Sequence, residues 1–304
     1  MSQTYNPILL TAGVQDAFLR QLSGAESASF VPRIATKIAS NKSSETYAWI
    51  GESPAMQAWS GEARFDAMSN ASYAISNSKF QSGLVIDRDD LADDQVGGLE
   101  LRIQQLAQVA IGHRNKRLIN ALINGTTNTG HDATAFFSDT HPIRGQMSAT
   151  QDNLLAGTGT TTAQIQADIT SSIAAMMRFV AENGEPFHEA PQEFVIVAPP
   201  NVMGNMNEAI FAGIVSNTSN VRNAGLSITP LYTSRLTDVN DWYLLRVDTP
   251  LRPLIFQVRE PVTLEPEDMM STGPFEREQY RYKVRGRYNV GYGHWANAVK
   301  VVNS

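Results

Sequence analysis

The sequence predicts an elongated α+β fold, because it contains one unusually long strand pattern and one equally long helix pattern. Over residues 279–290, apolar or aromatic residues alternate with mostly basic ones. A period of two over that length indicates a β-strand with one buried face and one polar face. Over residues 98–124, apolar residues recur every three or four positions, which is typical of a helix with one buried stripe. Each element would extend for about 40 Å, so the helix can cover the aromatic face of the strand in a long, flat molecule.

Composition limits the class of protein. The chain has 304 residues, a hydrophobic content of 42% and a net charge of −6, and it contains no cysteine. This length allows a sizeable core, and the lack of cysteine excludes disulfides, thiolate metal sites and cysteine nucleophiles. We expect neither a membrane span nor a secretory signal, because no apolar run approaches about 20 residues. The negative charge argues against general nucleic-acid binding, although local basic faces stay open to that role.

The first part of the chain predicts one helix and a pair of strands around a long connection. Residues 14–22 have a helical pattern, and the rest of residues 1–46 would either fray or lie as an arm on the protein or on a neighbour. Strand patterns at 47–51 and 72–86 predict an extended hairpin. Its connection carries three large apolar side chains in a polar background, namely Trp59, Phe65 and Met68. We expect them to contact a partner, with packing on their own domain as the alternative, because such exposed groups are a liability in a monomer.

A dense acidic run precedes the long helix and contains Asp87, Asp89, Asp90, Asp93 and Asp94. A divalent-metal cluster is one interpretation, but the glycine of a calcium loop is missing at the corresponding place. We favour carboxylates that stabilise the start of the helix and form a solvated or subunit-facing acidic patch. Asp89 and Asp90 are therefore candidate intersubunit contacts.

The loop at residues 130–145 carries four side chains of metal-binding types, namely His131, Asp132, Asp139 and His141. A metal-dependent enzyme is therefore an alternative to consider. However, the two histidines are not one helical turn apart and no glutamate stands beside them as a base. We expect an ordered loop anchored by its aromatic residues, and we predict no metal and no other cofactor.

The second half of the chain predicts a separate α/β unit over about residues 160–248, after a Gly/Thr-rich boundary at 150–162. Its expected elements are a helix over 165–180, a buried strand over 194–198, a helix over 201–212, and strands over 226–229 and 242–245. A strand over 254–259 would then lead back toward the long strand. The sequence shows no Ser-His-Asp grouping, no phosphate-binding glycine loop and no convincing pair of carboxylates, so we predict that the protein is not an enzyme.

Six short motifs occur along the chain. They are Tyr47-Ala48-Trp49-Ile50-Gly51, Asp87-Arg88-Asp89-Asp90, Phe136-Phe137-Ser138-Asp139-Thr140-His141-Pro142, Trp242-Tyr243-Leu244-Leu245, Phe256-Gln257-Val258-Arg259-Glu260, and Gly286-Arg287 through Gly291-Tyr292-Gly293-His294-Trp295. Each motif alone is weak, but in this order they resemble the major head subunit of Mu-like phages and prophages, over nearly the whole chain.

The resemblance implies the Hong Kong phage-type major capsid fold. Its parts would be an N-terminal arm (1–46), an extended loop built as a long β-hairpin (47–88), a peripheral domain with a spine helix (89–159), an axial domain (160–248), and a return to the peripheral domain with long β-strands (249–304).

The resemblance also implies a function. The protein would be the major capsid protein of a Mu-like tailed phage or prophage, assembled in the bacterial cytoplasm into hexamers and pentamers of an icosahedral head around double-stranded DNA. Its partners would be copies of itself, scaffold, portal and decoration proteins, and packaged DNA bound without sequence specificity, with no membrane involved. An encapsulin-like nanocompartment shell, a tail-tube or sheath protein, and a metal-dependent enzyme using His131, Asp139 and His141 are the alternatives.

The polar face of the long strand is basic at alternate positions, namely Arg281, Lys283, Arg285 and Arg287. This face could be solvated, pair with acidic residues or face packaged DNA. We expect residues 87–94 or 260–268, in the same or an adjacent subunit, to meet it. Exposed ion pairs contribute only about 0–1 kcal/mol each, so they would select register and partner while apolar contacts supply most of the affinity.

Overall fold

A computed structural model of the chain describes residues 7–47, 61, 73–87, 98–143, 150–181, 184–215, 218–219, 225–267 and 276–303. The α-helices are α1 (Pro7–Ala25), α2 (Val31–Ile34), α4 (Gly98–Ile123), α5 (Thr162–Met177) and α6 (Met203–Phe211). The strands are β1 (Ala35–Ala39), β2 (Ser44–Tyr47), β3 (Tyr73–Ser76), β4 (Ser78–Asp87), β5 (His141–Pro142), β6 (Thr150–Gln151), β7 (Leu154–Ala156), β8 (Glu193–Ala198), β9 (Ile214–Val215), β10 (Thr218–Ser219), β11 (Ser227–Tyr232), β12 (Trp242–Arg246), β13 (Leu254–Pro266), β14 (Gln279–Tyr292) and β15 (Ala298–Val302).

The predicted long strand is confirmed as β14, which lies inside a four-stranded sheet of order β1-β13-β14-β4. Its even-numbered residues Tyr282, Val284 and Tyr288 are buried, whereas Arg281 and Lys283 are exposed. The antiparallel partner β13 has two register shifts, between Val258 and Glu260 and between Glu260 and Thr263. Each shift places one extra residue in β13, which is the definition of a β-bulge.

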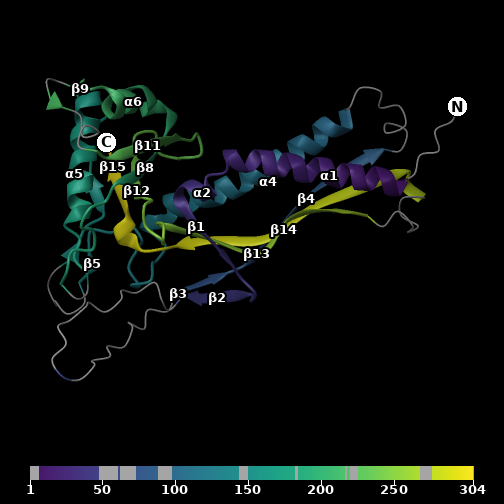
Figure 1. The fold of residues 1–304 in the computed structure, drawn as a ribbon, viewed down its shortest axis with the longest axis horizontal. Coiled ribbons are helices and arrows are strands. Elements are labelled where there is room, and N and C mark those ends of the chain that lie inside the picture. The colour runs from purple at the N-terminus through teal and green to yellow at the C-terminus, as the bar shows by residue number, and fades with distance from the viewer. Residues whose placement is uncertain are drawn as a thin grey trace.

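The predicted long helix is confirmed as α4, which has 26 residues and covers the aromatic face of β14. Tyr288 hydrogen-bonds to His113 through its hydroxyl, with 2.8 Å between the oxygen and Nδ1. The Tyr292 hydroxyl donates to the carbonyl oxygen of Ala121 at 2.8 Å. The helix and the strand therefore meet along the length of an elongated body, with a compact block at one end (Figure 1).

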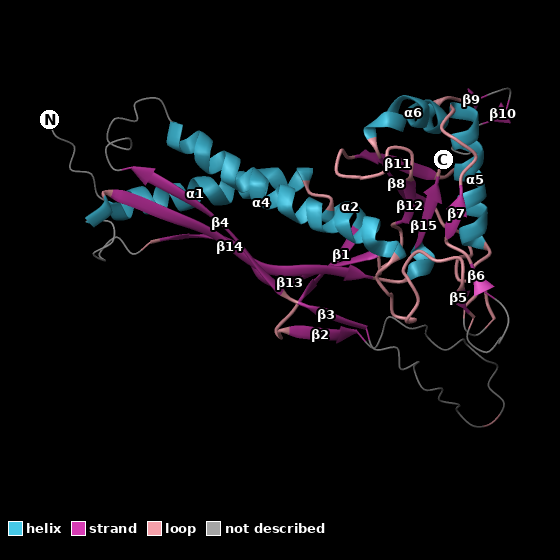
Figure 2. Ribbon diagram, turned by 180° about the vertical axis from the view of Figure 1, so that it is seen from behind, coloured by secondary structure: helices cyan, strands magenta, loops and turns pink. Residues whose placement is uncertain are grey.

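The N-terminal segment lies on the rest of the protein. Its predicted helix is longer than expected, α1 at Pro7–Ala25, and it packs against α4 with Phe18 and Leu22 buried. Beyond α1, Glu26 pairs with Arg114, and the Asn115 side-chain oxygen accepts from the backbone N–H of Phe30 at 2.8 Å. Both α1 and α4 lie on one side of the four-stranded sheet (Figures 1 and 2).

The predicted hairpin is present as the antiparallel pair β2–β3, on the side of the sheet opposite to α4 (Figure 2). The expected strand over 72–86 is divided at Asn77, because β3 pairs with β2 whereas β4 joins the sheet beside β14. Of the expected strand over 47–51, only Tyr47 lies within the described residues. The sequence predicts no strand for β1, which pairs in parallel with β13.

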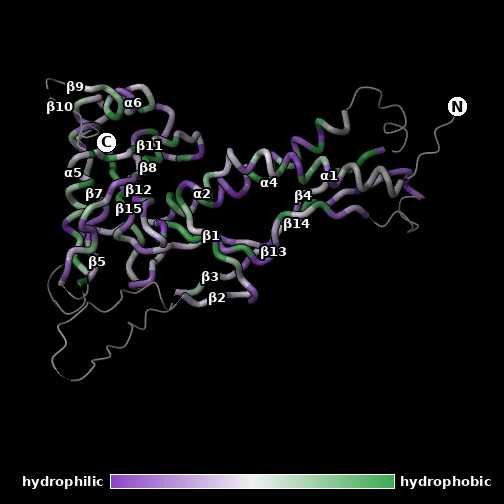
Figure 3. Tube along the Cα trace, in the orientation of Figure 1, coloured by the Kyte–Doolittle hydropathy of each residue, from purple (hydrophilic) through white to green (hydrophobic). Residues whose placement is uncertain are grey.

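The predicted α/β unit is confirmed element by element in the compact block. A five-stranded sheet of order β11-β8-β12-β15-β7 is contacted by α5 and α6. Its central strands are hydrophobic (β8 in Figure 3), and Ile196, Trp242 and Val299 are fully buried. β7 and β15 come from outside residues 160–248, so the sheet takes strands from more of the chain than the predicted unit. The domain boundaries themselves stay a prediction.

Gly293, at the junction of the two sheets, has no room for a side chain. A Cβ added to Gly293 would lie 2.3 Å from the carbonyl oxygen of Arg252, which is backbone and cannot rotate away. We expect Gly293→Ala to lower the free energy of unfolding by about 2–4 kcal/mol, measured by urea denaturation. Gly204→Ala is the matched control, because no atom lies within 4 Å of its added Cβ and alanine favours a helix by up to about 1 kcal/mol. Equal stability of the two variants would contradict the prediction.

Candidate functional site

The basic strand face, defined as Arg281, Lys283, Arg285 and Arg287 on β14, is partly neutralised within the chain. Arg285 lies 2.8 Å from Glu260, and Lys283 lies 3.1 Å from Glu265. Two longer contacts, Arg285 to Glu265 at 3.6 Å and Arg287 to Glu260 at 4.0 Å, complete a cross-strand ladder with β13. The expectation that residues 260–268 meet this face in the same subunit is therefore confirmed for two glutamates.

Two cations on this side of the sheet, Lys79 and Arg281, are uncompensated within the described residues. On β4, Lys79 pairs in register with Arg287, and Val85 pairs in register with Arg281. Lys79 and Arg281 are exposed, and within the described ranges neither has an ion-pair partner. Both cations are suited to an acidic neighbour, and their role as intersubunit contacts stays a prediction.

The other predicted contact residues lie outside the residues that the structure describes. These are Trp59, Phe65, Met68, Asp89 and Asp90, together with Asp93 and Asp94 of the acidic run. Asp87 ends β4, opposite Gln279 at the start of β14. Of the acidic run, the structure therefore places Asp87 alone, at one end of the four-stranded sheet.

The loop considered for metal binding is instead a hydrogen-bonded anchor. His141 is fully buried between two protein acceptors, with 2.7 Å from Nδ1 to Oδ2 of Asp132 and 3.1 Å from Nε2 to Oδ1 of Asn153. Asp139 is exposed, and the His131 ring lies against the ring of His294 at 4.6 Å. Among the described residues, no group of three or more His, Asp or Glu side chains is arranged to hold a metal ion.

Four of the five histidines, which we call the histidine junction, meet where the two sheets join. They are His131, His141, His188 and His294. Trp295 stacks on His141 with 4.0 Å between ring centroids, and Phe187 stacks on His294 at 4.3 Å. These side chains come from the loop after α4, the α5–β8 connection and the end of β14, so the junction ties both sheets together.

Asn153 fixes the hydrogen bonding of His141. Its side-chain nitrogen donates to three carbonyl oxygens, of Phe136, Trp295 and Ala298, so its oxygen must face His141. The imidazole therefore donates through Nε2 to Asn153, while its Nδ1 lies against the Asp132 carboxylate. Burial alone would raise the pKa of Asp132, but the hydrogen bond and charge of His141 bring that pKa below its usual value.

The neighbouring histidines are held neutral. The Nε2 of His188 donates to the carbonyl oxygen of Ala296 at 2.8 Å, so its Nδ1 is bare and faces the guanidinium of Arg246. Burial lowers the pKa of His188 to about 4. His294 accepts from the backbone N–H of Ala296 through Nδ1, and burial lowers its pKa well below the usual value, with the other junction histidines adding to the effect.

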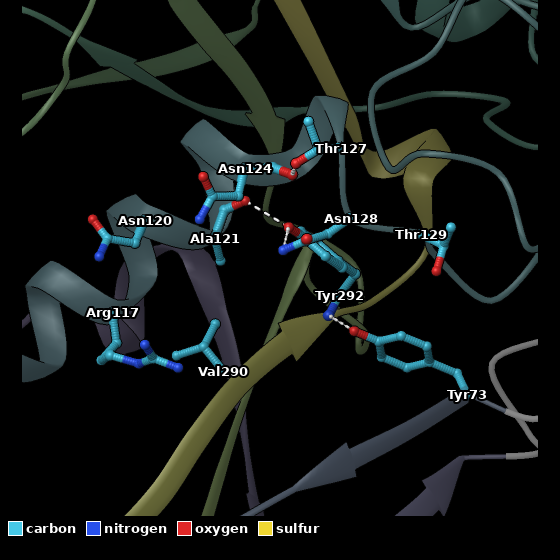
Figure 4. A pocket seen from close by; sticks show the side chains of 10 residues that line it. All are labelled: Tyr73, Arg117, Asn120, Ala121, Asn124, Thr127, Asn128, Thr129, Val290 and Tyr292. Carbon is cyan, nitrogen blue, oxygen red and sulfur yellow. Dashed lines mark hydrogen bonds between the residues drawn. The ribbon is translucent and has the colours of Figure 1, made fainter. Parts of the chain in front are cut away.

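A polar cavity of 390 Å³ opens at the C-terminal end of α4 (Figure 4). Arg117, Asn120 and Asn124 line it from the helix, and Tyr73 and Tyr292 line it from the strands. Arg117 donates to the Asn289 side-chain oxygen at 2.7 Å, while its buried Nε has no acceptor. The sequence did not predict this site, because its lining residues come from the end of α4 and from strands far away in the chain.

None of the helices in the described segments combines the length and the apolar character that crossing a bilayer requires.

Sequence comparison assigns a family to most of the chain. Residues 9–165 and 232–304 match the family described as "Mu-like prophage major head subunit gpT". The Mu-like prophage FluMu major head subunit of Haemophilus influenzae is 25% identical over 279 residues, which cover 91% of this chain and 68% of that protein. The major capsid protein of Escherichia phage Mu is 30% identical over 111 residues, which cover 36% of each chain.

Comparison with solved structures shows that the chain has the fold of phage capsid proteins. The procapsid protein of bacteriophage JBD30 superposes with a TM-score of 0.57 and 23% identity, covering 99% of this chain and 77% of that one. The predicted α+β, Hong Kong phage-type capsid fold is thereby confirmed.

Because the histidine junction buries neutral histidines, we predict that the folded protein loses stability in acid. A histidine that is neutral when folded but has a pKa near 6.5 when unfolded binds fewer protons in the folded state, so stability falls as the pH drops from about 6.5 to about 4. For His188 alone the loss approaches roughly 3 kcal/mol. We expect the melting temperature to fall over this interval, and His188→Gln to flatten that fall. An unchanged pH dependence in the variant would contradict the assignment.

The Asn153 side chain gives a second prediction for the same junction. Asn153→Asp would direct a carboxylate oxygen at three buried carbonyl oxygens in place of a donor, so we expect a loss of about 3–5 kcal/mol in the free energy of unfolding. The same substitution at Asn205, an exposed residue that donates to the carbonyl oxygen of Thr160 at 2.8 Å, should cost less than about 1 kcal/mol. Urea denaturation of both variants measures the difference, and equal losses would refute the role of Asn153.

Proposed function

Because this chain belongs to the family of Mu-like prophage major head subunits, we propose that it builds the icosahedral head of a Mu-like phage or prophage by assembling into hexamers and pentamers around double-stranded DNA. It is a major capsid protein, and its action is self-association, for which the described residues supply extended charged faces. The match to the family over residues 9–165 and 232–304 is the observation that carries the proposal.

The shape of the subunit supports this proposal. A helix and a strand of about 40 Å each form a two-layer slab, so a large part of the chain lies near a surface that another subunit can reach. We assign β13, β14 and α4 to the peripheral domain, and the α/β unit over residues 160–248 to the axial domain around the centre of a ring. Residues 1–46 would then be the N-terminal arm, and residues 47–88 would include the extended loop.

Cohesion between subunits would combine weak charged contacts with apolar ones. Lys79 and Arg281, the two uncompensated cations on this side of the four-stranded sheet, would meet the acidic run of a neighbour. The side chains of Trp59, Phe65 and Met68 would supply apolar anchors. Single exposed pairs are weak, but each subunit of a closed shell is held on several sides at once, and linked contacts reinforce one another. Scaffold, portal and decoration proteins would be further partners during assembly in the host cytoplasm.

Negative-stain electron microscopy of the expressed protein tests the function directly. We expect closed shells built from rings of six and five subunits. Filaments would favour a tail-tube or sheath protein, and a protein that stays monomeric under all assembly conditions would refute self-assembly. Shells that capture an enzyme cargo and exclude DNA would favour a nanocompartment.

The basic strand face supplies a variant test of assembly. Lys79→Glu/Arg281→Glu reverses two charges that have no ion-pair partner among the described residues, so the subunit should stay folded while shells disappear. Circular dichroism and negative-stain images measure the two outcomes. Lys300→Glu, which breaks an ion pair with Asp241 (2.9 Å) on the five-stranded sheet, controls for charge reversal elsewhere and should destabilise the subunit instead. Normal shells from the double variant would refute the contact.

A further inference from the structure

A second basic surface, which the sequence did not indicate, lies on the opposite side of the four-stranded sheet. We call it the cationic helix face and define it by Lys116, Arg117 and Asn120 of α4, by Asn124 of the 3₁₀ turn that follows α4, and by Arg235. Arg235 comes from the β11–β12 connection and lies over α4, since its guanidinium is 3.4 Å from the position of a Cβ on Gly112. Lys116 and Arg235 are exposed, and Arg117 is half-buried.

None of the cations of this surface has a carboxylate partner among the described residues. Within the described part of the chain, Lys116, Arg117 and Arg235 form no ion pair, and the buried Nε of Arg117 has no acceptor. The basic strand face differs, because Glu260 and Glu265 interleave its charges. The cationic helix face is therefore the less neutralised of the two.

The three cations converge on one place. His113 lies one helical turn before Lys116 and Arg117, and its pKa is lowered by burial first and then by the charges of Arg117, Lys116 and Arg235. Within the described residues, no carboxylate contributes to that shift. The positive potential is thus local to the C-terminal half of α4, in a chain whose net charge is −6.

The dimensions and chemistry fit a nucleic-acid backbone. From His113 to Asn124 the helix rises by about 17 Å, and a duplex of that length carries about ten phosphate charges. Lysine, arginine and asparagine are the side chains that commonly contact phosphate oxygens without reading the sequence. Asn120 and Asn124 extend the row of donors into the polar cavity beyond Arg117 (Figure 4).

We propose that the cationic helix face binds the phosphate backbone of packaged duplex DNA, and that the α4 side of the sheet therefore faces the interior of the shell. This inference rests on the proposed function as a head subunit. The basic strand face lies on the other side, with the β2–β3 hairpin, and is left for contacts between subunits (Figures 1 and 2). An acidic segment of a neighbouring subunit is the competing occupant of the cationic helix face.

Two charge-matched double variants test the proposal. Lys116→Gln/Arg235→Gln removes two exposed cations from the cationic helix face, and Lys79→Gln/Arg281→Gln removes two from the side of the sheet that carries the basic strand face. Binding of each unassembled subunit to a labelled duplex of random sequence is measured by fluorescence anisotropy over a salt series. We expect the slope of log affinity against log salt to fall by about two in the first variant and by less than about 0.5 in the second. Adding Arg117→Gln to the first variant should remove about one more.

The outcomes separate this inference from the proposed function. Equal reductions in both double variants would show an effect of net charge alone and would overturn the proposal, as would a wild-type subunit that does not bind the duplex. Loss of shells with an unchanged DNA slope in Lys116→Gln/Arg235→Gln would assign the face to a neighbouring subunit instead. Failure of the wild-type protein to form shells in parallel images would count against the head function, whatever the DNA result.

Discussion

The burial of one face of β14 under α4 is the constraint on which the rest of the structure depends. Tyr282 and Tyr288 lie on that face, and each buried tyrosine removes a large apolar area from water. A strand of 14 residues can be covered only by an element of similar length, which is why α4 has 26 residues. The outcome is a slab of two layers, whose outer surfaces are both left to carry charge.

Local sequence patterns were sufficient to predict the long helix and the long strand, but they did not predict how the strands pair. β14 and α4 follow from periodicity alone, because every turn or pleat repeats the same signal. β1 was not foreseen, since its place beside β13 depends on residues more than 200 positions away, such as Leu254 opposite Ala35. Likewise, Asn77 divides the expected strand because its side chain donates to Ser40 and to the carbonyl oxygen of Lys42, which lie in another part of the chain.

The candidate sites, like the fold, could be predicted from the sequence only where the signal is local. Alternation placed the basic residues of β14 on one face, and the suggestion that residues 260–268 neutralise them was right for Glu260 and Glu265. The cationic helix face escaped detection because Arg235 joins it from the other sheet. The loop with His131 and His141 attracted a metal hypothesis because its true partners, including His294, lie far along the chain. Residue type predicted local chemistry, and only the tertiary structure supplied the neighbours.

The two bulges of β13 have a geometric consequence for the whole slab. Each inserts one residue opposite an unbroken β14, and such insertions bend the strand and increase its right-handed twist. The two-stranded ribbon β13–β14 is therefore strongly twisted and bent, and it is not flat. The twist and the bend of this ribbon are therefore built into a single chain, without any contact with a second copy.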